Sequence, residues 1–331
     1  MIVILGEPGD VVIDDAIRYF DRRGIAAERV DCSRFPGDLA VTLTFSARGH
    51  ARRRLATAGG EIDLDRVTAV WHRDVCAGRP RAILDPRARR FAELEAEEVL
   101  RQLWSQLSAV FVPGSWEVIL QGQRKLHQLA LASALGFEIP PSIVTSDPGA
   151  LLAFLREHEF RCITKHLAHH STSESGLDDE MIRFTEPVTL RDLAAYRAAR
   201  LAPVFAQAYV PKRVELRVTV VGAQVFAAEI SSQRAARTRH DYRRLDHKHA
   251  RYTVHALPGP IAARCRAITH ALGLRYGALD LVVTPDGRYV FLEINPRGEF
   301  HWVEQLTGLP ITRAICELLI AHAETGVADA S

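Results

Sequence analysis

The chain has 331 residues, of which 47% are hydrophobic and 25% charged, and these ordinary values exclude a mostly disordered protein. Lys and Arg number 42 against 40 Asp and Glu, and this net charge of +2 argues against a dedicated nucleic-acid binder. No apolar run approaches the roughly 18 residues that a membrane helix needs, so we expect no membrane partner. The length predicts two or three domain-sized units.

The N-terminus and the cysteines predict a cytoplasmic protein. The run Ile2–Leu5 is short and lacks a basic segment before it, so it indicates a first strand rather than a signal peptide. The cysteines are scattered without a CxxC pair, which indicates reduced thiols, and none has a base beside it in sequence to support thiol catalysis. They are Cys32, Cys76, Cys162, Cys265 and Cys316.

Residues 1–113 alternate strand and helix signals, as is typical of an open α/β unit. Hydrophobic periodicity predicts helices over 11–23 and 87–107. Short apolar runs predict strands over 2–5, 26–30, 39–45 and 67–71.

A second unit is expected over residues 114–206. Its predicted helices cover 123–135 and 148–158, and its predicted strands cover 142–145, 161–165 and 203–210. The polar stretch 166–180 is expected to be a loop, and its neighbouring His169 and His170 are interpreted as solvated rather than as metal ligands.

The third unit, residues 207–331, has the most regular pattern. We expect hairpins over 214–230 and 276–294, with the second turning at Asp286-Gly287, and helices over 260–272 and 311–323. The basic stretch 231–251 is expected to be a loop. Its His247 and His249 are either solvated or part of a surface that docks an acidic peptide.

The second hairpin carries a pair of acidic residues. If Asp286 and Gly287 form a two-residue turn, Asp280 lies directly opposite Glu293, and Asn295 shares the face of Glu293. Opposed carboxylates repel and are costly to bury, and a divalent cation removes that conflict.

Oxygen ligands suit Mg²⁺ or Mn²⁺, and Mg²⁺ in proteins commonly uses substrate phosphates as further ligands, so this cluster predicts a bound nucleotide. The alternative is a solvated sheet face on which the acids pair with arginines. The apolar neighbours of Asp280 and Glu293 favour the metal site.

Two lysines fit beside a nucleotide. Lys165 ends an apolar strand and Lys125 opens a helix, so both ammonium groups can neutralise phosphate charge. Taken alone, each lysine is better interpreted as a surface residue, and the chain contains neither a Walker A sequence nor GxGxxG.

Several stretches together resemble the ATP-grasp superfamily and, more narrowly, the ligases that macrocyclise ribosomal peptides of the graspetide (microviridin-like) class. The resemblance covers nearly the whole chain and implies an ATP-grasp fold of the α/β (α+β) class, with an N-terminal pre-ATP-grasp domain before two ATP-clamping subdomains. It rests on Val70-Trp71-His72-Arg73, Arg124-Lys125-Leu126, Lys165, Gln207-Ala208-Tyr209-Val210-Pro211-Lys212, Glu215-Leu216-Arg217-Val218-Thr219-Val220, Tyr276-Gly277-Ala278-Leu279-Asp280, Phe291-Leu292-Glu293-Ile294-Asn295-Pro296 and Arg297-Gly298-Glu299-Phe300-His301-Trp302.

The resemblance also implies roles for individual residues. Those expected to bind the nucleotide are Lys125 and Lys165 at the phosphates, Gln207, Ala208, Tyr209 and Val210 at the adenine, and Glu215 at the ribose. Those expected to hold Mg²⁺ are Asp280, Glu293 and Asn295. Those expected to act on the transferring phosphoryl group are Arg217, Arg297 and Lys165.

The implied activity is an ATP-dependent carboxylate ligase that works through an acyl phosphate. Its substrate would be a precursor peptide with a leader segment, in which Asp or Glu side chains are joined to Thr, Ser or Lys side chains. Ser171–Gly176 is a candidate lid against water, and Trp302 is a candidate wall of the acceptor pocket.

Two other functions stay open. One is an amino-acid ligase that acts on a small molecule or a protein terminus, since it would share the ATP site. The other is an ATP-binding regulatory scaffold without turnover, which the complete set of metal ligands disfavours. A homodimer is expected only because symmetric dimers are common among soluble enzymes.

Overall fold

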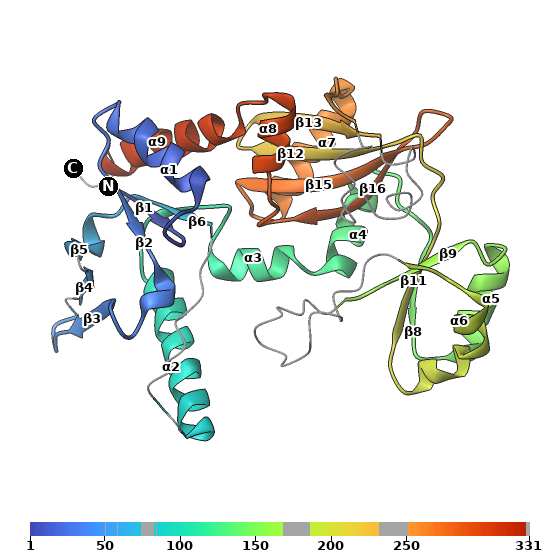
Figure 1. Ribbon diagram of the computed structural model, residues 1–331, viewed down its shortest axis with the longest axis horizontal. Coiled ribbons are helices and arrows are strands. Elements are labelled where there is room, and N and C mark those ends of the chain that lie inside the picture. Colours follow the sequence, from blue (N-terminus) through green and yellow to red (C-terminus); the bar gives the residue numbers. More distant parts are fainter. Residues whose placement is uncertain are drawn as a thin grey trace.

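The structure is a computed structural model that describes residues 1–49, 51–57, 59–73, 83, 85–167, 186–231 and 251–328. Three units lie along its longest axis, and both termini are in the N-terminal unit (Figure 1). The candidate lid Ser171–Gly176, His169, His170, His247, His249 and Cys76 lie outside the described residues. Among the described helices, none is long and apolar enough to cross a membrane.

The N-terminal unit is built on a parallel sheet of order β2-β1-β6-β7. Alternate side chains of β1 enter two separate cores, because successive residues of a strand point to opposite faces. Helix α2 covers one face, and helix α1 lies on the other. The strands are β1 Ile2–Leu5, β2 Ala27–Val30, β6 Ala69–His72 and β7 Val110–Val112, and the helices are α1 Val11–Asp21 and α2 Pro86–Ser105.

The two helices of this unit begin at capped ends. The Asp10 carboxylate accepts hydrogen bonds from the backbone N–H groups of Val12 and Ile13, and Asp85 caps α2 in the same way ahead of Pro86. The periodicity of the sequence therefore predicted both helices, with ends shifted by a few residues.

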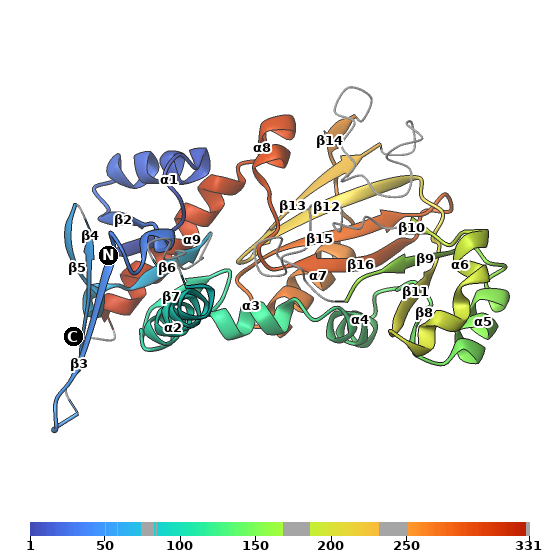
Figure 2. The same cartoon turned by 60° about the horizontal axis from the view of Figure 1, so that its bottom comes forward.

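A three-stranded antiparallel sheet of order β3-β4-β5 extends from this unit (Figure 2). Its strands are β3 Ala40–Phe45, β4 Ala51–Thr57 and β5 Gly60–Asp63. The sequence predicted only the first strand. Three consecutive arginines, Arg52 to Arg54, hide the alternation of β4, in which Leu55 alone is fully buried.

The C-terminal helix α9, Ile311–Ala328, packs in the core of the N-terminal unit. It lies beside α1 and over β6, and Ile315 and Leu319 are fully buried there with Ile2 and Phe20. The chain thus returns to its own start (Figure 1). Sequence periodicity predicted this helix but could not show which unit it covers.

The central unit contains a small sheet of order β10-β9-β11-β8. Leu151, Leu155, Cys162 and Ala206 form its own core, whereas Phe205 enters the core of the C-terminal unit. Its elements are β8 Ser142–Thr145, α5 Pro148–Glu157, β9 Cys162–Lys165, β10 Glu186–Pro187, α6 Leu190–Ala194 and β11 Val204–Ala208, and the helices α3 Trp116–Gly122 and α4 Lys125–Ala134 lead into it from the N-terminal unit.

The C-terminal unit has a five-stranded sheet of order β14-β13-β12-β15-β16. Helices α7 and α4 bury the apolar face, and the opposite face carries Glu215, Arg217 and Asp280 in otherwise buried surroundings. Its elements are β12 Val214–Val221, β13 Gln224–Ile230, β14 Tyr252–Val254, α7 Gly259–Ala271, β15 Tyr276–Val283, β16 Tyr289–Asn295 and α8 His301–Thr307.

The turn of the second hairpin differs from the prediction. Thr284 and Arg288 pair across a three-residue loop, in which Gly287 has φ 88°. Pro285 cannot donate the ladder hydrogen bond that a two-residue turn would require. A bulge at Leu292 then restores the predicted register, so Asp280 pairs with Glu293.

The packing of α9 makes a testable prediction about stability. Ile315→Ala should lower the free energy of unfolding by about 2–5 kcal/mol, because it leaves a cavity beneath the N-terminal sheet. Arg313→Ala on the exposed face of α9 is the control and should change it by less than about 0.5 kcal/mol. Denaturant unfolding measures both, and equal stability of the two variants would contradict this packing.

His72 is a buried histidine at the end of β6. Its side chain is 2% exposed, its ring packs edge-on against Phe111, and neither ring nitrogen has a hydrogen-bond partner among the described residues. Burial, with the nearby charge of Arg297, lowers the pKa of His72 to about 3. The folded protein therefore holds this imidazole neutral.

His72 should make stability depend on pH. Between its folded pKa of about 3 and its usual value of 6.5 the unfolded chain binds the extra proton, so stability is lost as pH falls below 6.5. From pH 7 to pH 5 this one group accounts for about 2 kcal/mol.

In His72→Phe the loss of stability from pH 7 to pH 5 that His72 causes should disappear. In the control His270→Gln, at an exposed histidine, this loss should remain. Unfolding at both pH values tests this. An equal pH dependence in wild type and His72→Phe would contradict it.

Candidate functional site

The centre of the candidate site is the pair Asp280 and Glu293, which face each other across β15 and β16 as the sequence predicted. Each carboxylate has a cationic partner. The Arg217 Nη1 lies 3.0 Å from the Asp280 Oδ1, and the Lys125 Nζ lies 3.4 Å from the Glu293 Oε2. The arginine pairing that the solvated alternative expected is thus present at Asp280 but not at Glu293, and Asp280 is only 8% exposed.

Arg217 is held beside Asp280 from a second direction. Its Nη2 donates a hydrogen bond of 3.1 Å to the main-chain oxygen of Glu299. The turn between Asn295 and Glu299 approaches so closely that a Cβ at Gly298 would lie 2.5 Å from Arg217 Nη2 and from Ala278 Cβ. Glycine at 298 is therefore required by this close contact.

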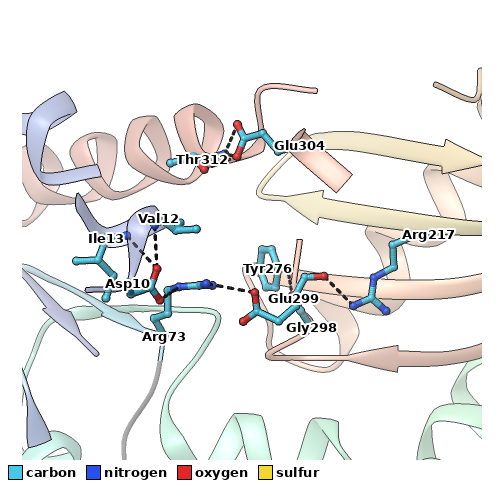
Figure 3. Close-up of polar contacts among 10 residues, drawn as sticks. All are labelled: Asp10, Val12, Ile13, Arg73, Arg217, Tyr276, Gly298, Glu299, Glu304 and Thr312. Carbon is cyan, nitrogen blue, oxygen red and sulfur yellow. Dashed lines mark hydrogen bonds and ion pairs between the residues drawn. The ribbon is translucent and has the colours of Figure 1, made fainter. Parts of the chain in front are cut away.

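Tyr276 holds the same turn through its hydroxyl group. Its hydroxyl donates a hydrogen bond to the main-chain oxygen of Gly298 (Figure 3). Burial raises the pKa of Tyr276 well above its usual range, so the phenol stays protonated and remains a donor.

Asn295 ends β16 and Arg297 lies two residues beyond it, and both are exposed. The Asn295 Oδ1 accepts a hydrogen bond of 3.0 Å from the backbone N–H of Arg297, and the Arg297 guanidinium lies 5.9 Å from the centre of the Trp116 ring. The amide oxygen has a second lone pair that remains suitable for a cation.

Lys125 opens α4, as predicted, and Gln128 one turn later anchors this helix to β16. The buried Gln128 amide donates to the main-chain oxygens of Gly122 and Ile294, at 2.6 and 2.8 Å, and accepts from the Ile294 N–H at 3.1 Å. This double contact places Lys125 against Glu293. Gln128 was not among the predicted site residues, because in the sequence it resembles an ordinary exposed helix residue.

Lys165 lies at the end of β9, opposite Phe205 of β11. Residues that pair across antiparallel strands project to the same side, and Phe205 packs into the core of the C-terminal unit. Lys165 is therefore on the face of the small sheet that turns toward the unit carrying Asp280.

The predicted adenine segment continues from β11. The N–H groups of Ala208 and Tyr209 already donate to the main-chain oxygens of Pro141 and Arg161, at 2.9 and 2.8 Å. The Gln207 amide donates to the Ser142 hydroxyl at 2.8 Å, and its buried Oε1 accepts no hydrogen bond from the part of the chain that the structure describes.

Glu215 forms an ion pair with Lys212 in which the Lys212 Nζ lies 3.1 Å from the Glu215 Oε2. Both side chains are nearly inaccessible, at 7% and 6% exposure. Sequence reasoning assigned no role to Lys212, although its three-residue spacing from an acidic residue was visible.

In the part of the chain that the structure describes, no three His, Cys, Asp or Glu side chains gather to hold a metal. A cation between Asp280 and Glu293 would need Asn295, water or phosphate oxygens to complete its shell, as Mg²⁺ commonly does. Trp302 packs edge-on against Tyr252, with ring centres 5.6 Å apart.

Two of three comparisons with known proteins find similar proteins. Residues 2–118 match the family model of the MvdD pre-ATP grasp domain. A comparison with curated proteins finds no match.

Among solved structures, the chain is similar to the macrocyclase MdnC of Microcystis aeruginosa MRC bound with precursor peptide MdnA (32% identity, 96% of this chain and 99% of that one, TM-score 0.84). It is also similar to macrocyclase MdnB of the same organism (30% identity, 96% and 98% covered, TM-score 0.79).

A third similar structure is a RiPP-associated ATP-grasp ligase of Chryseobacterium gregarium in complex with ADP and a leader and core peptide (28% identity, 97% and 96% covered, TM-score 0.87). These similarities cover nearly the whole chain, including the small sheet that carries Lys165 and the large sheet that carries Asp280. The chain has the ATP-grasp fold with a pre-ATP-grasp domain, and it belongs to the graspetide (microviridin-like) family of ATP-grasp ligases.

Proposed function

We propose that this protein is an ATP-dependent ligase that macrocyclises a ribosomal precursor peptide. It would join Asp or Glu side chains to Thr, Ser or Lys side chains as esters or amides. The observation that carries this proposal is the opposed pair Asp280 and Glu293 on a largely buried sheet face, within a chain that belongs to the graspetide ligases. The related MdnC was solved bound with precursor peptide MdnA, and the Chryseobacterium gregarium ligase in complex with a leader and core peptide, which supports a leader-bearing substrate.

Asp280, Glu293 and Asn295 are the residues that would hold Mg²⁺, with Mn²⁺ as a possible substitute. Their oxygen donors suit a hard cation, and both carboxylates lie opposite each other on neighbouring strands. When bound, the cation would neutralise phosphate charge and polarise the phosphoryl group. Lys125 would then exchange the Glu293 carboxylate for a phosphate oxygen.

Lys125 and Lys165 would hold the phosphates from the two units. Lys125 is the first residue of a ten-residue helix whose N-cap, Arg124, makes no side-chain capping bond. The N–H groups of the first turn can therefore serve the same anion.

The segment Gln207–Val210 would bind the adenine, and Glu215 the ribose. Because the N–H groups of Ala208 and Tyr209 are engaged within the sheet, we place the adenine hydrogen bonds on the Val210 N–H and on the carbonyl oxygens of the segment. Lys212 would hold the Glu215 carboxylate in its orientation.

In the proposed reaction a substrate carboxylate attacks the γ-phosphorus, the bond to the β–γ bridging oxygen breaks, and ADP leaves. The substrate hydroxyl or amine then attacks the acyl carbon, phosphate departs, and the attacking group loses its proton. Arg217 would stabilise charge on the transferring phosphoryl or acyl phosphate, Arg297 would meet negative charge at the metal side, and Lys165 would hold the γ-phosphate.

We propose the division 1–113, 114–206 and 207–331 as domains, with two adjustments. Strand β11 runs on to Ala208, and α9 packs with the first domain. We also propose a cytoplasmic location, which the buried thiols of Cys162, Cys265 and Cys316, none of them in a disulfide, support.

The decisive experiment is mass spectrometry of the chain with ATP, Mg²⁺ and the Thr-rich acidic peptide that we expect its neighbouring gene to encode. The product should lose one water for each bond formed. Glu293→Gln should abolish this loss, because one metal oxygen is replaced by a neutral amide.

Asp286→Asn is the matched control, since it removes a carboxylate from the exposed turn of the same hairpin, and it should keep wild-type turnover. An unchanged peptide mass with folded wild-type protein would contradict the proposed substrate. Normal turnover by Glu293→Gln would contradict the metal assignment.

A further inference from the structure

A chain of polar contacts joins the N-terminal unit to Arg217 (Figure 3). It runs from Asp10 at the start of α1 through Arg73, which follows β6, to Glu299 beyond β16. Arg73 and Glu299 are 226 positions apart in the sequence. The N-terminal unit therefore touches the turn that holds a proposed catalytic group.

Arg73 is fixed from the N-terminal side. Its Nε donates a 2.6 Å hydrogen bond to the Asp10 Oδ2, and only 12% of its side chain is exposed. The Asp10 carboxylate is itself held in place, because its Oδ1 accepts the capping hydrogen bonds from the N–H groups of Val12 and Ile13 at the start of α1. The guanidinium is thus preorganised before it meets the other unit.

On its far side Arg73 contacts two consecutive residues of the C-terminal unit. Its Nη2 donates to the Glu299 Oε2 at 3.2 Å, and its guanidinium lies 5.5 Å from the centre of the buried Phe300 ring. The main-chain oxygen of Glu299 in turn accepts from Arg217 at 3.1 Å. One residue therefore contacts both arginines, through its side chain and its backbone.

The pair of Arg73 and Glu299 adds little to folding. The Glu299 side chain is 63% exposed, and exposed ion pairs contribute little to stability. The pair of Arg73 and Glu299 instead affects the position of the turn, because the turn is tightly packed. Gly298 already lies against Arg217 and Ala278, so a shift of the turn moves the guanidinium itself.

We propose that Arg73 is a positioning residue, which acts through Glu299 to hold the turn 295–300 and thereby the Arg217 guanidinium beside Asp280. The pre-ATP-grasp unit is then part of the catalytic apparatus. This inference rests on the proposed role of Arg217 in the phosphoryl-transfer chemistry.

Arg73→Met and Glu299→Gln test this separately and together. Each should lower kcat about tenfold, with the KM for ATP within about twofold, because orientation of the transition-state contact is lost and not nucleotide binding. Glu299→Gln should also leave the melting midpoint unchanged, whereas Arg73→Met, which removes the cationic partner of Asp10 as well, should lower it slightly. The double variant should be no slower than Arg73→Met, since both changes break the contact between Arg73 and Glu299. Arg73→Lys should recover part of the rate.

Arg53→Gln is the control, since it removes a similarly placed arginine of the N-terminal unit that pairs with Asp65 at 2.7 Å. It should leave kcat unchanged. Additive losses of kcat in the double variant would overturn the positioning role. So would a loss of kcat in Glu299→Gln that is accompanied by a clearly lower melting midpoint.

Hydrogen exchange gives a readout that needs no turnover. Amide exchange over 295–300, including the Gly298 N–H bonded to the Asn295 oxygen, should quicken in Arg73→Met and not in Arg53→Gln. Unchanged exchange would overturn the inference even if the chain proved inactive. An inactive wild type with quickened exchange in Arg73→Met would instead contradict the proposed function and support the positioning role.

Discussion

The central constraint in this molecule is the opposition of two carboxylates, Asp280 and Glu293, on neighbouring strands. Two such charges on one largely buried sheet face repel unless positive charge lies between or beside them. In the structure Arg217 and Lys125 supply that charge, and each reaches the site from a different element. The same charge balance suits a site that exchanges its side-chain cations for a metal–nucleotide complex. In that state the acids would bind the metal, and the side-chain cations would bind the phosphates.

The surrounding fold holds each of those two cations in place through one residue. Gln128 ties the helix of Lys125 to the backbone of β16, and Glu299 ties Arg217 to the turn beyond it. The N-terminal unit takes part in two ways, through Arg73 at that turn and through α9, which the C-terminal unit contributes to the N-terminal core. A pre-ATP-grasp domain joined in this way is a support of the site rather than a separate module.

Much of this was predictable from sequence, and what was not has a physical reason. Apolar runs on either side of turn residues predicted β12 and β15, and the assumed turn at Asp286-Gly287 predicted the facing of Asp280 and Glu293. The turn prediction was wrong by one residue, and the bulge at Leu292 compensated for it. Contacts such as that of Arg73 with Glu299 leave no local pattern, because they depend on how distant units pack. The roles of the individual site residues stay predictions.

Nucleotide binding with and without metal tests the central claim most directly. In a calorimetric titration of ADP, the account predicts that Mg²⁺ tightens binding to the wild-type chain by about tenfold or more, relative to binding in the presence of a chelator. It predicts that Asp280→Asn loses this gain while still binding metal-free ADP. Retention of the full Mg²⁺ gain in folded Asp280→Asn would contradict the claim that the opposed carboxylates form the cation site.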